Sequence, residues 1–193
     1  MKRILLCLML SSSFLFSALG QVTRISDNTS YEWGFPLTSS LLLMRSQISN
    51  TLWVYDATGN TFTQLSTTMT VASNASFGFF NGKFYFAGTT AAEGIELWVT
   101  DGTPAGTVLV KDINPSGDSN PNYGFIVYNN ELYFTAADGT TGRELWKTNG
   151  TGAGTVQIKD INTGPGNGFS NKRNSSQLLR SHYSRPHTII VPP

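Results

Sequence analysis

The sequence predicts an all-β protein assembled from repeated four-stranded antiparallel sheets. The first observation is an internal repeat: the nineteen residues 96–114 return 48 positions later as residues 144–162, with fourteen positions identical. Self-similarity at a fixed spacing of this size indicates a repeat architecture. The second observation is composition, because 12% of the residues are aromatic and 19 are glycine, with Thr, Ser and Asn also abundant. This mixture suits short strands joined by tight turns.

The first twenty residues have the pattern of a secretory signal peptide. Two basic residues precede an apolar stretch, and residues 18–20 supply small side chains at the expected cleavage site. The apolar stretch is shorter than the roughly 20 residues that a transmembrane helix needs. We therefore expect residues 1–20 to be removed before Gln21, leaving no membrane span and a secreted or cell-envelope protein. The only cysteine, Cys7, would leave with them.

The repeat domain is expected to span residues 21–169. Its three repeats are placed at about residues 31–75, 76–123 and 124–169. The first is the least regular, although Trp53 stands 45 positions before Trp98, close to the 48 that separate Trp98 from Trp146.

Each repeat is predicted to contain four short strands. In the second repeat they are placed at residues 77–80, 83–87, 95–100 and 107–113, with a loop over 88–94. Asn81-Gly82 separates the first two, and it is a strong hairpin signal because both central positions of such a turn need positive φ. Alternation along the next strand puts Phe84 and Phe86 on one face and Tyr85 on the other.

The last strand of the repeat shows which face should be buried. Val108 and Val110 become Val156 and Ile158 in the third repeat, whereas the intervening Leu109 becomes polar. Because the first pair stays apolar, we expect Val108 and Val110 to point to the more buried side.

Four-stranded units at this period are typical of β-propeller blades, which repeat every ~40 to 50 residues. Residues 96–114 and 144–162 resemble the ELWxxDGT repeat family of exported, often multi-repeat bacterial surface proteins. The resemblance implies a β-propeller-like fold and a secreted or cell-surface setting, and it carries no established activity.

About three blades are predicted, whereas known closed propellers have at least about four. We therefore expect an incomplete propeller. Its blades would assemble with other copies through their exposed faces or belong to a longer protein.

The repeat pattern stops near residues 168–169. Residues 170–193 lack the strand, turn and aromatic strand that a fourth repeat would bring, and residues 171–193 contain four Lys or Arg residues and no acid. We expect this aberrant tail to be a disordered end or the result of a shift in the coding frame, and a basic binding tail is the alternative.

Three tryptophans at blade spacing are the candidate ligand-platform or structural residues: Trp53, Trp98 and Trp146. Packing between blades is the expected role, and a platform on which sugars stack is the alternative. The repeated segments 101–103 and 149–151 are expected to be tight turns, because Asp or Asn followed by Gly is what turn geometry requires.

No cofactor is expected, and calcium is the alternative considered. Oxygen-bearing side chains gather after the second Trp strand, at Asp112, Asn114, Asp118 and Asn120. Calcium prefers such ligands, but their spacing does not fit an EF-hand, and the second copy lacks an acid after Asp160.

The sequence singles out no catalytic residues. The two histidines, His182 and His187, lie in the tail, and Glu96 and Glu144 are repeat positions, whereas an active site is normally unique. With 13% charged residues and a net charge of +1, nucleic acid is not an expected partner. We expect a non-enzymatic scaffold that binds glycan or protein. The alternatives are a polysaccharide-acting propeller enzyme and a non-functional fragment of a longer repeat protein.

Overall fold

The computed structural model describes residues 31–72 and 75–169. Within these ranges the chain forms strands and turns with no helix, so the predicted all-β class is confirmed. Consequently, no helix in the described part is long and apolar enough to cross a membrane. The expected signal peptide, residues 1–20, and the aberrant tail, residues 170–193, lie outside the described residues.

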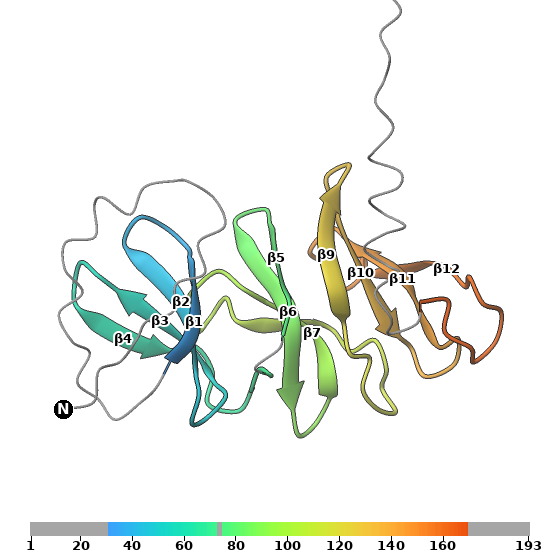
Figure 1. Ribbon diagram of the computed structural model, residues 1–193, viewed down its shortest axis with the longest axis horizontal. Coiled ribbons are helices and arrows are strands. Elements are labelled where there is room, and N and C mark those ends of the chain that lie inside the picture. The colour runs from blue at the N-terminus through green and yellow to red at the C-terminus, as the bar shows by residue number, and fades with distance from the viewer. Residues whose placement is uncertain (1–30, 73–74, 170–193) are drawn as a thin grey trace, which may run out of the picture.

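In the described part of the chain, twelve strands form three four-stranded antiparallel sheets, and neighbours in sequence are neighbours in each sheet (Figure 1). The first sheet contains β1 (Tyr31–Pro36), β2 (Leu41–Ser46), β3 (Leu52–Asp56) and β4 (Thr61–Gln64). The second contains β5 (Phe77–Phe80), β6 (Lys83–Thr90), β7 (Gly94–Thr100) and β8 (Val108–Lys111). The third contains β9 (Asn122–Tyr128), β10 (Glu131–Ala137), β11 (Arg143–Thr148) and β12 (Val156–Lys159).

The two-residue hairpins form as predicted. Asn81 and Gly82 have φ of 49° and 74°, and Asn129 and Asn130 have φ of 49° and 59°. These positive angles match the right-handed twist of the flanking strands, which is why Asn and Gly occupy them.

The predicted loop over residues 88–94 is wrong in extent. β6 continues to Thr90 and β7 begins at Gly94, where the two residues pair, so the loop shrinks to residues 91–93. Glu93 closes it, because its amide and its carboxylate both bond the Thr90 hydroxyl. Both bonds involve the Thr90 side chain and lie within one turn, so hydrophobic alternation does not reveal them.

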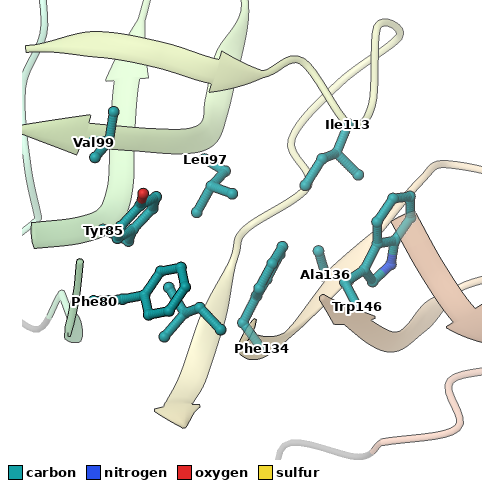
Figure 2. Close-up of a cluster of buried hydrophobic side chains, with 9 residues drawn as sticks. Phe80, Tyr85, Leu97, Val99, Ile113, Phe134, Ala136 and Trp146 are labelled. Atoms are coloured by element: carbon teal, nitrogen blue, oxygen red, sulfur yellow. The ribbon is translucent and has the colours of Figure 1, made fainter. Parts of the chain in front are cut away.

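Two hydrophobic clusters join the three sheets, and opposite faces of the second sheet contribute to them. Phe84 and Phe86 belong to the cluster shared with the first sheet, and Tyr85 to the cluster shared with the third, as alternation predicted. Figure 2 shows the second cluster, in which side chains from the second and third sheets point toward one another. Its buried members are Phe80, Tyr85, Leu97, Val99, Ile113, Leu132, Phe134, Ala136 and Trp146.

The buried face expected for the last strands is only partly found. Val110 packs against the second cluster, but Val108 is 46% exposed and its counterpart Val156 is 39% exposed. The reason is position, because β8 and β12 are edge strands that pair on one side only, and Val108 and Val156 are their first residues. The register also shifts between Leu97 and Trp98 where β8 pairs with β7.

Candidate functional site

The three candidate tryptophans lie one on each sheet. Trp146 is 6% exposed within the cluster between the second and third sheets, and Trp98 packs against the cluster between the first and second. Each of these two therefore contacts the sheet that precedes its own. A methyl group added at Gly88 would come 2.7 Å from the Trp98 ring, so the indole lies directly on that glycine.

Trp53 occupies the same position on the first sheet but has a different setting. It alternates along β3 with Leu52 and Val54, which pack toward the second sheet, so Trp53 lies on the opposite face. Its indole Nε1 donates to the Thr51 hydroxyl at 2.9 Å, and its side chain is partly exposed. Packing thus accounts for Trp98 and Trp146, and a ligand-stacking role stays a proposal for Trp53.

The glutamate before each later tryptophan is a functional residue of the fold that sequence reasoning did not assign. Glu96 is fully buried, and its carboxylate accepts the Ile113 amide at 2.7 Å, the Ser119 amide at 2.9 Å and the Ser119 hydroxyl at 2.6 Å. Glu144 is also fully buried and accepts the amides of Ile161 and Gly168 at 2.9 and 2.7 Å. In both repeats the carboxylate binds backbone amides of the segment that follows the last strand of its sheet.

Burial raises the pKa of Glu96 above its ordinary value of 4.5, and the nearby carboxylate of Asp112 adds to the rise. The hydrogen bonds from Ser119 and Ile113 oppose it by stabilising the charged form. A carboxylate enclosed by donors and closed to solvent is placed to hold the backbone and not to meet a substrate. Only its recurrence at positions 96 and 144 could have indicated this role from sequence.

In the first repeat, an arginine side chain binds the corresponding segment. Thr51 stands where the later repeats have glutamate, and the buried Arg45 on the neighbouring strand donates from Nε to the Val71 carbonyl at 2.6 Å. Its guanidinium also bonds the Asn50 side chain, and the Val71 amide bonds the Asn50 carbonyl at 2.7 Å. In the first sheet, Arg45 thus donates a hydrogen bond to a carbonyl of the segment that follows the last strand. In the other two sheets, the glutamates accept hydrogen bonds from amides of that segment.

The repeated turns at residues 101–106 and 149–154 are closed hydrogen-bond networks. Asp101 Oδ1 accepts the amide and the hydroxyl of Thr103 at 2.9 and 2.7 Å, and Asn149 Oδ1 accepts the same groups of Thr151 at 3.0 and 2.8 Å. The hydrogen bond from the Thr103 hydroxyl lowers the pKa of Asp101, so this carboxylate stays ionised. These contacts close the turns, which is the structural role that the sequence predicts for them.

Asp101→Asn is expected to leave the free energy of unfolding nearly unchanged, because Asn149 makes the same bonds in the equivalent turn of the third repeat. Asp101→Ala removes both acceptor interactions and is expected to cost about 1 kcal/mol. Urea unfolding of the two variants beside the wild type measures the difference. Equal losses in both variants would contradict this account of the turn.

Of the oxygen-bearing side chains that could ligate calcium, Asp118 and Asn114 make local bonds, whereas Asp112 Oδ1 is buried and has no hydrogen-bond partner. Asp118 Oδ1 accepts the Ile95 amide at 2.9 Å, and Asn114 Oδ1 accepts the Ser116 amide at 3.3 Å and its hydroxyl at 3.0 Å. In the part of the chain that the structure describes, no three His, Cys, Asp or Glu side chains gather as metal ligands would.

We expect the thermal unfolding midpoint to be the same with added calcium and with a chelator. Asp118 and Asn114 already bond to neighbouring backbone, so an ion would have to displace those bonds. Among the described residues, no three His, Cys, Asp or Glu side chains gather around Asp112 to hold an ion. Differential scanning calorimetry under the two conditions is the measurement. A midpoint that rises with calcium and falls with chelator would revive the calcium alternative.

Comparisons with known proteins add no identity. No protein-family model matches the chain, and no curated protein matches it either. The histidines at 182 and 187 lie outside the described residues. The role of these residues is therefore argued from their geometry, which joins strands, turns and connecting segments in the same way in the second and third repeats.

Proposed function

We propose that this chain is an exported, non-enzymatic binding scaffold built as part of a β-propeller. The support for propeller blades is the way the sheets meet. β5 and β9, the first strands of the second and third sheets, contact each other, and the sheets pack face to face through a shared cluster (Figure 1). Blades around a common axis meet in this manner, with their first strands innermost.

The repeated use of the motif residues supports a scaffold over an enzyme. Glu96 and Glu144 hold backbone amides in equivalent places, and Asp101 and Asn149 close equivalent turns. Each group is committed to the fold of its own repeat. A catalytic pair would instead need carboxylates that differ in environment and face a common substrate.

The binding surface we propose lies on the innermost strands. Phe79 on β5 is 53% exposed, and Val127, which stands at the equivalent place on β9, is 50% exposed. Large apolar side chains exposed at matching positions of contacting strands offer a surface for the face of a sugar ring or for an apolar protein side chain. This exposure is the observation that carries the binding proposal.

The test is a binding screen with the purified chain against a panel of soluble polysaccharides and extracellular proteins. Binding without turnover, weakened at least about tenfold by Phe79→Ser, is the expected result; tenfold corresponds to about 1.4 kcal/mol. Ile48→Ser is the matched control, because Ile48 is 68% exposed and lies between β2 and β3. Cleavage of any polysaccharide would favour the enzyme alternative and overturn the proposal.

Export has its own test. N-terminal sequencing of the product recovered outside the cytoplasm is expected to begin at Gln21. A product that stays in the cytoplasm with residues 1–20 attached would contradict export and leave the binding test intact.

A further inference from the structure

The outer face of the third sheet is the uncovered counterpart of a face that is buried on the other two sheets. Leu52 and Leu97, which precede the tryptophan of the first and second repeats, are both 0% exposed and pack toward the next sheet. Leu145 holds the same position on the third sheet and is partly exposed. The difference lies in the neighbour, because no further sheet follows within the described residues.

The segment after the last strand shows the same contrast more strongly. Ile113 is 5% exposed in the cluster between the second and third sheets, and its counterpart Ile161, 48 positions later, is 48% exposed. Val110 packs against that cluster, and its counterpart Ile158 is 42% exposed. The third sheet therefore carries the apolar side of a blade interface, and no described part of the chain packs on it.

A lysine of the covered interface shows how one sheet reaches the next. Lys111 Nζ donates to the Thr155 carbonyl beside β12 at 2.8 Å and lies 5.9 Å from the centre of the Trp146 ring. Lys159 is the counterpart of Lys111 on the third sheet and is exposed. It is placed to make the same bond to a following sheet.

The complementary half of this interface is present on the first sheet. Trp98 and Trp146 each pack on the preceding sheet, and Trp53, at the same position, faces away from the second sheet. Tyr55 and Phe62 lie beside it on β3 and β4, with ring centres 4.8 Å apart. One end of the described domain thus carries the tryptophan side of a blade interface, and the other end carries the leucine and isoleucine side.

One substitution makes this face of the third sheet more polar than the equivalent faces of the other two sheets. Val54 and Val99 are buried in the two clusters. The equivalent position on the third sheet is Lys147. Lys147 Nζ lies 2.9 Å from a carboxylate oxygen of Glu131 on the same sheet. Interfaces that form reversibly are more polar than permanent ones, so this ion pair favours a partner in a separate molecule.

We propose that the outer face of the third sheet binds the first sheet of a second copy of this chain, head to tail. The three described sheets of each of two copies bring six sheets together, which lies within the range of about four to eight blades in closed propellers. A head-to-tail interface closes into a ring when its rotation permits and otherwise continues into a filament. This inference does not depend on what the scaffold binds.

The test is light scattering after size exclusion, across a concentration series of the purified whole chain. The double variant Ile158→Asp and Ile161→Asp blocks the tail face, and Tyr55→Asp blocks the head face. Each variant alone is expected to lose the assembly, with association weakened at least about tenfold by the buried charge. Ile48→Asp, on an exposed turn, is expected to assemble like the wild type.

Mixing the two blocked variants separates a head-to-tail interface from a symmetric one. The mixture is expected to form a dimer, because one copy still has its head and the other its tail. A wild-type chain that stays monomeric throughout would overturn the proposal, and so would a Tyr55→Asp variant that still dimerises alone. Far-UV circular dichroism checks the fold of each variant, and Gln64→Arg on the same face replaces Tyr55→Asp if that variant unfolds.

Discussion

Glu96→Ala is expected to lower the free energy of unfolding by about 3 to 5 kcal/mol. The substitution leaves two amides and one hydroxyl without their acceptor at a site closed to solvent. It also frees the segment at Ile113 and Ser119, which leads from the second sheet into the third. Urea unfolding followed by tryptophan fluorescence measures the loss.

Glu144→Ala is the matched comparison within the same chain. Its carboxylate accepts two amides where Glu96 accepts three donors, so a smaller loss of about 2 kcal/mol is expected. A larger effect at Glu144 than at Glu96 would contradict the assignment of stability to these bonds.

The raised pKa of Glu96 gives a pH dependence of definite sign. Because the folded protein holds this proton more tightly than the unfolded chain, the contribution to stability is complete below about pH 4.5, the ordinary pKa. This contribution is lost as the pH rises through the raised pKa of the folded protein. At higher pH the stability no longer depends on the titration of Glu96. Glu96→Gln does not titrate, so the stability difference between wild type and this variant is expected to narrow with rising pH in that window.

Phe134→Ala is expected to cost about 3 to 5 kcal/mol, because its ring is 1% exposed in the cluster that joins the second and third sheets. The cavity would open beside Trp146 and Leu97, which belong to different sheets, so the loss would fall on the contact between sheets (Figure 2). Chemical unfolding is expected to remain a single transition with a lower midpoint.

Tyr133→Ala is the control on the same strand. Tyr133 neighbours Phe134 but lies on the outer face, where its hydroxyl donates to Glu131 at 3.3 Å and its side chain is partly exposed. We expect a loss of about 1 kcal/mol. Equal effects at the two positions would mean that the sheets do not share a core, and face-to-face packing would be wrong.

Local features of the fold could be read from sequence because they depend on near neighbours. The hairpins at Asn81-Gly82 and Asn129-Asn130 follow from residues that tolerate positive φ, and the split of Phe84 and Phe86 from Tyr85 follows from strand alternation. The length of the loop after β6 could not be read this way, because a bond within the turn between Glu93 and Thr90 sets it.

The role of the motif glutamates needed the tertiary structure. Glu96 bonds residues 17 and 23 positions further along the chain, and no local pattern shows where those amides lie. The same holds for Arg45, whose bond to the Val71 carbonyl spans 26 positions. A charged residue beside an apolar strand is equally compatible with a solvated surface until the fold closes around it.

By itself, the sequence determined that this chain is all-β, that it repeats, and how each repeat alternates its side chains. Only the tertiary structure decided which faces are covered. Ile113 and Ile161 occupy the same place in nearly the same sequence, yet one is 5% and the other 48% exposed. The physical reason is that burial belongs to a pair of surfaces, and a strand's own residues specify only one of them.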